Sequence, residues 1–117
     1  MKIEQMETST RPLVGSIRFE DWRNPIQMAG DVDAVVRLAR SYYCTWTPEQ
    51  LEQLPWVVTA NPPSTTQTIV ACAVVASRAE INFAGTPDQH NLLRDMALTM
   101  AAAATRLRQL RSFGNRV

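Results

Sequence analysis

Residues 92–111 read LLRDMALTMAAAATRLRQLR, and this stretch decides the fold. Apolar side chains recur along it at alternating steps of three and four, which places them on one stripe of a long helix. The stripe consists of Leu93, Met96, Met100, Ala103, Leu107 and Leu110. Just upstream, residues 86–89 (TPDQ) combine a capping threonine, a proline at the first helical position and a capping-box glutamine. We therefore expect a long amphipathic C-terminal helix that begins there and buries this stripe.

Two further helices are expected in the middle of the chain. Asp31 is a suitable N-cap for an amphipathic helix over about residues 31–44, in which apolar and charged side chains separate onto opposite faces. The segment TPEQLEQL at residues 47–54 repeats the capping signature and predicts a short helix. Trp46 and Trp56 bracket this short helix, so we expect both indoles to hold it against the core.

The chain before Gly30 carries weaker signals. We expect a short extended segment over residues 13–19 and a turn at Asn24-Pro25, because the residue before a proline is pushed out of the helical region. The first helix is therefore expected only after Gly30.

The segment 64–79 is ambiguous. Its central residues 69–76 are continuously apolar, and their β-branched members suit a buried strand as well as a buried helix. Ser64 stands in position for a capping box with Gln67, and the alanines favour a helix, so we predict a buried helix. The alternative is a strand that pairs with a neighbouring segment, at 56–59 or 81–83, which would make the fold α+β.

Together these elements predict an all-α fold, a compact three-helix bundle with a short extra helix. The length suits one domain over residues 1–117 with a single hydrophobic core, and we expect residues 1–12 and 114–117 to be flexible. No apolar run approaches the length of a membrane span, and the N-terminus does not read as a signal peptide. We therefore expect no membrane insertion and a cytoplasmic location.

Residues that carry chemistry are sparse. His90 is the only histidine and is expected to face solvent, and no local signature joins it to Cys44 or Cys72, which we expect to be buried, reduced thiols. Asp31 and Asp33 look like metal ligands, but no further oxygen-rich loop completes a cage. Phosphate-binding loops of the GxGxxG and GxxxxGK[ST] types are absent. We therefore predict no catalytic, cofactor-binding or metal site, and a protein that is not an enzyme.

One position on the C-terminal helix breaks the apolar pattern. Leu98 lies almost opposite the stripe, beside Ala102, where a large apolar residue is either exposed or covered by another chain. The leading prediction is a non-enzymatic protein-interaction or adaptor module that binds a partner helix or its own copy through Leu98 and Ala102. Tyr42 and Tyr43 are further candidates if they line a groove instead of the core.

The alternative prediction is a nucleic-acid-associated regulatory protein. No acidic residue follows Asp95, whereas Arg106, Arg108, Arg111 and Arg116 all follow it, so the C-terminal end is locally basic. These arginines could contact phosphates, in which case binding would weaken steeply with salt. Arginines near the end of a helix also complement its dipole, which explains them without nucleic acid.

Two stretches carry a family resemblance. WTPEQLEQLP at residues 46–55 and MAAAATRL at residues 100–107 resemble stretches of small uncharacterised bacterial helical proteins of the Burkholderia type, over about residues 31–112. The order of three main helices and one short helical turn is also similar to a KIX-type domain, whose family role is to bind amphipathic activation helices in hydrophobic grooves. That resemblance implies helix binding, although this chain has few lysines and no recognisable groove signature.

Overall fold

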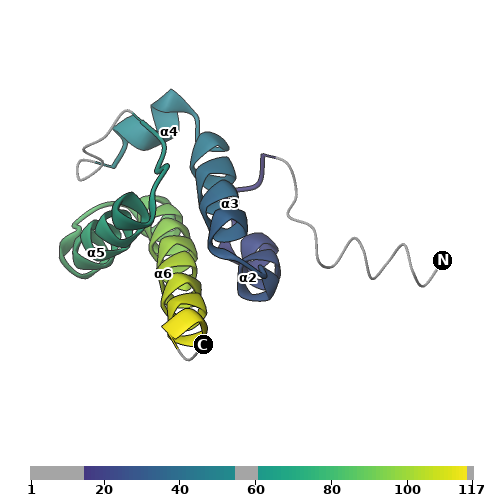
Figure 1. Ribbon diagram of the computed structural model, residues 1–117. Helices are drawn as coiled ribbons and strands as arrows, with labels where there is room; N and C mark the ends of the chain where they lie inside the picture. The colour runs from purple at the N-terminus through teal and green to yellow at the C-terminus, as the bar shows by residue number, and fades with distance from the viewer. Residues whose placement is uncertain (1–14, 55–60, 116–117) are drawn as a thin grey trace.

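The computed structural model describes residues 15–54 and 61–115, with side chains up to residue 112 (Figure 1). Within these ranges the chain forms helices and no strand. The helices are α2 (Phe19–Met28), α3 (Val32–Cys44), α4 (Pro48–Glu52), α5 (Thr66–Asn82) and α6 (Pro87–Asn115). The prediction of an all-α fold is confirmed, and the segment that could be helix or strand is the helix α5.

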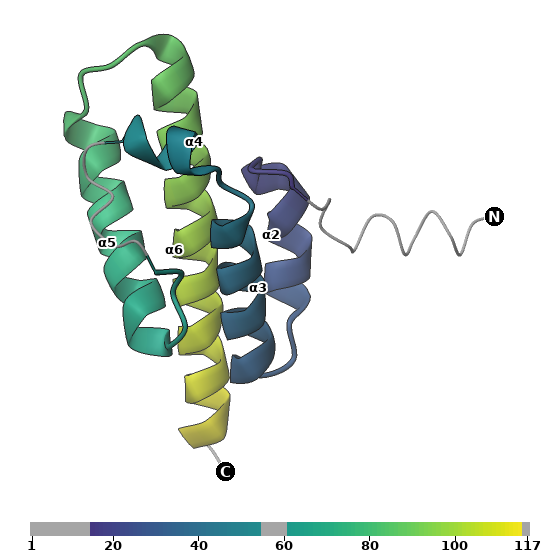
Figure 2. The ribbon, with the colours of Figure 1, turned by 90° about the horizontal axis from the view of Figure 1, so that it is seen from above.

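α6 is the central helix of the bundle. It lies between α5 on one side and α2 and α3 on the other, and α4 lies at one end (Figures 1 and 2). The predicted stripe is confirmed, because its members from Leu93 to Leu107 are at most 2% exposed and Leu110 is half-buried. Ala97 and Thr99 lie off the stripe and are buried too, since helices cover α6 on more than one side.

The predicted helix starts at Asp31, Thr47 and Thr86 are confirmed. The Asp31 carboxylate accepts a hydrogen bond from the backbone N–H of Ala34 at 2.7 Å and begins α3. Two capping boxes, with distances between 2.9 and 3.3 Å, pair Thr47 with Gln50 and Thr86 with Gln89. Local sequence therefore sets where α3, α4 and α6 begin.

The start of α5 differs from the prediction by one residue. The capping box joins Thr65 and Thr68, at 3.3 and 3.0 Å, instead of Ser64 and Gln67. The Thr68 hydroxyl also donates to the Thr65 carbonyl at 2.8 Å, so the threonine pair satisfies more groups than a single side-chain cap would.

α2 corrects the prediction for the start of the chain. Residues 19–28 are helical where the sequence predicts the end of an extended segment and a turn, and Pro25 lies buried inside this helix. Residues 13 and 14 of the predicted extended segment lie outside the described ranges. The first described helix therefore precedes Gly30 instead of following it.

Contacts with distant residues explain α2. Its N-cap residue, Arg18, makes no side-chain capping bond. Instead the backbone N–H of Phe19 donates to the Asp95 carboxylate on α6 at 3.0 Å, across 76 positions of sequence. Trp22 and Ile26 are buried at 2% and 0% exposure, and this burial offsets the hydrogen bond that a proline removes from a helix.

The structure describes only part of the residues on which the predictions about the chain ends and the two bracketing tryptophans depend. α6 runs to Asn115, and residues 1–12, 116 and 117 lie outside the described ranges. Trp46 is buried and meets Tyr42 edge-to-face, with ring centroids 6.3 Å apart, while Trp56 lies outside the described ranges. None of the described helices is both long enough and apolar enough to cross a membrane.

Candidate functional site

The first predicted contact residue, Leu98, lies on the surface of α6. It is 36% exposed, and Ala102 beside it is half-buried. Leu98 lines an open depression of about 340 Å³, whose other lining residues are Arg18, Phe19, Glu20, Asn91, Arg94 and Asp95. Four of these residues are charged, so Leu98 stands among polar groups and not within an apolar patch.

One polar group of this depression, the Asp95 carboxylate, joins α6 to α2. The Asp95 carboxylate caps α2 through Phe19, and Arg18 forms an exposed ion pair with Glu20. Thr99, one turn beyond Asp95, donates to the Asp95 carbonyl at 2.8 Å. The depression therefore marks the joint at which the start of α2 is fixed to α6.

Tyr42 and Tyr43 belong to the core and do not line a groove. They are 0% and 5% exposed. The Tyr42 hydroxyl donates to the Ile17 carbonyl at 3.2 Å, and its ring meets Trp22 edge-to-face at 5.4 Å. Burial raises the pKa of the Tyr42 phenol well above its ordinary value. Tyr42 and Tyr43 were candidates for partner contact only if they lined a groove, and they are buried in the core instead.

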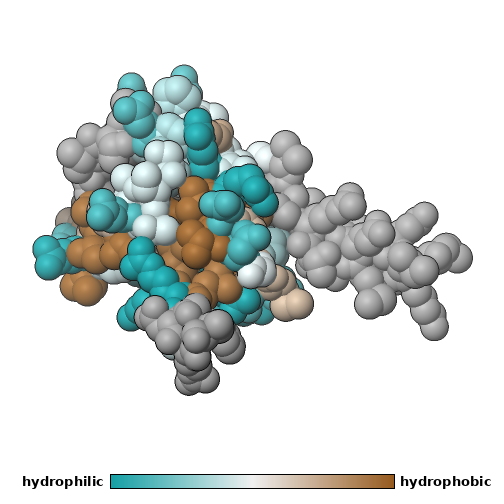
Figure 3. All heavy atoms as spheres, in the orientation of Figure 1, coloured by the Kyte–Doolittle hydropathy of each residue, from teal (hydrophilic) through white to brown (hydrophobic). Residues whose placement is uncertain are grey.

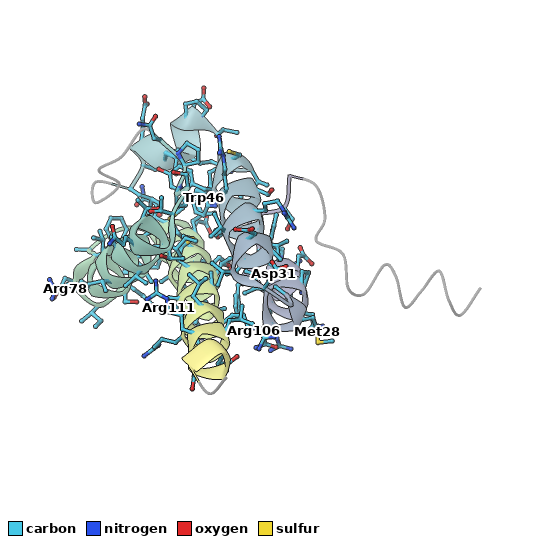
Figure 4. All side chains as sticks on the ribbon, in the orientation of Figure 1. Met28, Asp31, Trp46, Arg78, Arg106 and Arg111 are labelled. Carbon is cyan, nitrogen blue, oxygen red and sulfur yellow. The ribbon has the colours of Figure 1, made fainter. Side chains whose placement is uncertain are left out.

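Two of the four C-terminal arginines are used inside the chain. Arg106 Nε donates to the Ala29 carbonyl at the end of α2 at 2.9 Å, and Arg111 donates to the Thr66 hydroxyl on α5 at 3.0 Å. Figure 4 shows them extending from α6 toward α2 and toward α5. Arg108 is exposed, and Arg116 lies outside the described ranges. Arg106 and Arg111 thus extend in different directions from α6.

Cys44, Cys72 and His90 have different environments. Cys44 is exposed, which corrects the prediction of burial, and Cys72 is half-buried with its thiol pKa raised by burial. His90 is half-buried instead of solvent-facing: its Nε2 accepts from the Gly85 backbone N–H at 3.4 Å, and its ring meets Phe83 edge-to-face. Within residues 15–54 and 61–112, no three His, Cys, Asp or Glu side chains are grouped as metal ligands would be.

The prediction missed the outer face of α5. Val70, Val74, Val75 and Ile81 are 45%, 46%, 38% and 81% exposed, and Ala71 between them is exposed as well. In a helix these positions share one broad face. Figure 3 shows hydrophobic surface over α5, on the left of the view. We call these five residues the α5 outer face.

α5 is apolar on two opposite sides. Ile69, Ala73 and Ala76 are at most 7% exposed and pack into the core. The prediction of a buried helix is therefore correct for one side only. Because α5 packs chiefly on α6, at the side of the bundle, no described helix covers its outer face.

A sequence signal for this face does exist. No Asp, Glu, Lys, Arg or His occurs from residue 53 to residue 77, although 20% of the chain is charged. Surface helices of globular proteins normally place charged residues on the solvent side. A helix at the edge of a bundle with no charge in its first three turns is typical of an interaction surface, but only the structure shows that α5 is at the edge.

No family model, no curated protein and no solved structure matches this chain. The resemblances to bacterial helical proteins and to KIX-type domains therefore stay predictions.

Proposed function

We propose that this chain is a protein-interaction module that docks a helix of a protein partner on the α5 outer face. The observation that carries this proposal is the group of valines exposed by 38–46% between Val70 and Val75, a stretch of α5 without a charged residue. Single exposed apolar residues are ordinary on protein surfaces, whereas contiguous ones mark interaction sites.

The chemistry of the face suits a helical partner. An amphipathic helix presents apolar side chains at steps of three and four, which can interlock with a row of the same spacing. Val70, Val74 and Val75 are β-branched and have one strongly preferred rotamer in a helix. They therefore lose little side-chain entropy on docking, which favours association over a small area.

The α5 outer face has more support as a docking surface than Leu98 and Ala102. Leu98 is less exposed than Val70, Val74 or Ile81, and charged residues surround it. Burying it under a partner would also require desolvating Arg94 and Asp95 or pairing them with new groups. On the α5 outer face the corresponding cost is smaller, because Arg78 is its one charged neighbour, whereas four charged residues line the depression at Leu98.

The nucleic-acid alternative receives no comparable support. Arg106 and Arg111 are hydrogen-bonded to other parts of the chain. Releasing them to contact phosphates would sacrifice those bonds. Arg108 and Arg111 are both exposed, but Arg111 is bonded to Thr66 on α5. A basic surface that binds nucleic acid generally needs several cations on one face.

Site-specific photocrosslinking tests the proposal. A photoreactive amino acid replaces Val74 in the full chain, expressed in its source cells, and the same residue replaces Met28 as a matched control. Met28 is 74% exposed and apolar, but lies on α2 away from α5. We expect discrete protein adducts from position 74 and none from position 28.

A third variant tests the earlier prediction. The photoreactive residue at Leu98 reports on the depression between α2 and α6. Adducts from position 98 and none from position 74 would contradict the proposal and move the contact surface to Leu98 and Ala102.

A further inference from the structure

We infer that the α5 outer face binds α5 of a second copy of this chain, with the two helices antiparallel across a two-fold axis. This inference rests on the proposed function and names its partner. An isologous contact needs a surface that is complementary to itself. The order of residues along α5 provides one.

Charge sets the orientation of the two helices. α5 carries only two charged residues, Arg78 and Glu80, both near its C-terminal end. Arg78 is exposed, on the side of Val74 and Ile81, and Figure 4 shows it pointing away from α6. A parallel pairing would bring the two Arg78 guanidinium groups together. An antiparallel pairing separates them and places each beside the uncharged N-terminal half of the other helix.

Side-chain size fits the same arrangement. With the two-fold axis between residues 72 and 73, Ala71 of one copy faces Val74 of the other, so a small residue meets a larger one. Val70 faces Val75, and Gln67 faces Arg78. The Gln67 side chain is exposed, and its amide oxygen can accept a hydrogen bond from a guanidinium group.

The net charge of the chain permits self-association. The formal charge is +1 at pH 7, so two copies repel each other weakly. The N-terminal segment of the same chain is a poor occupant of the face, because it is charged at Lys2, Glu4, Glu7 and Arg11. An uncharged apolar row matches another uncharged apolar row better.

The size of the face predicts a weak dimer. A helix of 17 residues is about 25 Å long and about 10 Å wide. Two such faces of about 250 Å² each come to about 500 Å², below the range for stable specific complexes. We therefore expect monomers and dimers in rapid exchange, with dimers prominent only at high micromolar concentrations.

Sedimentation equilibrium of the full chain tests the dimer. The parent should show an average mass that rises reversibly from monomer toward dimer with concentration. Val74→Glu should lose the dimer, whereas Met28→Glu should behave as the parent, and circular dichroism should show the same helix content in all three. A parent that stays monomeric at every concentration, or a Val74→Glu variant that still dimerises, would overturn the inference.

Crosslinking tests the orientation. In a Cys44→Ser, Cys72→Ala background, Val74→Cys and Ile81→Cys are treated separately with a short bis-maleimide. In the antiparallel dimer the two residues 74 are offset by about 5 Å along the axis and the two residues 81 by about 25 Å. We expect a crosslinked dimer from Val74→Cys and none from Ile81→Cys. Equal crosslinking would indicate parallel helices and overturn the inference.

The two proposals fail in different ways. If the parent is monomeric and position 74 still forms photoadducts with another protein in cells, the second-copy inference fails and the docking function stands. If position 74 forms no adduct of any mass, the docking function fails as well.

Discussion

α5 and α6 are neighbours in sequence and pack along each other, yet they differ in how they meet solvent. α6 buries Leu93, Met96 and Met100 and even the polar Thr99, because helices pack around it. α5 contains the longest apolar run of the chain, and it exposes Val70 and Val74. Position in the bundle, and not local hydropathy, decides which apolar side chains are buried. Apolar residues left exposed in this way are available for a second chain.

Truncation of a buried residue on α6 should have the largest effect on stability. Leu93→Ala removes a fully buried side chain at the centre of the bundle and should lower the free energy of unfolding by about 2–5 kcal/mol. Val75→Ala on α5 should change it by less than about 0.5 kcal/mol, measured on dilute protein. Urea denaturation compares the two. Equal losses would remove the distinction between the helices.

Enlarging two adjacent residues of α5 separates its inner and outer faces. Ala73 is 7% exposed and Val74 is 46% exposed. Ala73→Leu should overpack the core and cost about 1–3 kcal/mol, whereas Val74→Leu should be close to neutral. Thermal unfolding followed by circular dichroism gives both values. A large loss from Val74→Leu would mean that the outer face is covered within the chain.

High pH should weaken the core around Tyr42. Burial raises the pKa of Tyr42, so the phenol stays neutral in the folded chain while it ionises at about pH 10 in the unfolded chain. The unfolded state therefore binds fewer protons above that pH, and stability should fall with a slope approaching about 1.4 kcal/mol per pH unit.

Tyr42→Phe is the control for this slope. Urea denaturation between neutral and alkaline pH should show a smaller decline in the variant. Both chains should carry Cys72→Ala, because burial also raises the pKa of Cys72 and adds to the decline. The same decline with and without the phenol would show that Tyr42 does not cause it.

Removal of the cap on α2 should have the smallest effect. Asp95→Ala leaves the backbone N–H of Phe19 without its acceptor and should cost about 1 kcal/mol, as helix caps do. Asp95→Asn keeps an acceptor oxygen and should retain most of that stability. Asn91→Ala, on α6 at the same depression, is the matched control. Hydrogen exchange of the α2 amides should reveal the loss. If Asp95→Ala leaves α2 as protected as in the parent, α6 does not organise the start of α2.

Local signals explain which helices the sequence predicts. Each of the helices α3, α4 and α6 begins at a cap whose two hydrogen-bonded residues are three positions apart in sequence. The capping residues Asp31, Thr47 and Thr86 are therefore recognisable without the structure. α2 is different because its cap, Asp95, lies far away in sequence and Pro25 reads as a turn. No pattern within the first thirty residues reports that distant contact.

The candidate site was less predictable than the fold. Periodicity identified Leu98 as an unusual position on α6, but only the structure shows the charged residues around it. Hydropathy predicted a buried α5, because an apolar run looks the same whether its partner is the core or another chain. In the sequence, Arg106 and Arg111 belong to a basic cluster near the C-terminal end. Their hydrogen-bond acceptors, Ala29 and Thr66, lie far away in sequence and are identified only by the structure.

The central claim is that the α5 outer face is open in the isolated chain and covered in the cell. Thiol labelling of Val74→Cys, in the Cys44→Ser, Cys72→Ala background, measures this directly, with Met28→Cys as the exposed control. We expect both positions to react in dilute purified protein, and the ratio of labelling at position 74 to labelling at position 28 to be lower in cells. The same ratio in cells and in purified protein would contradict the claim.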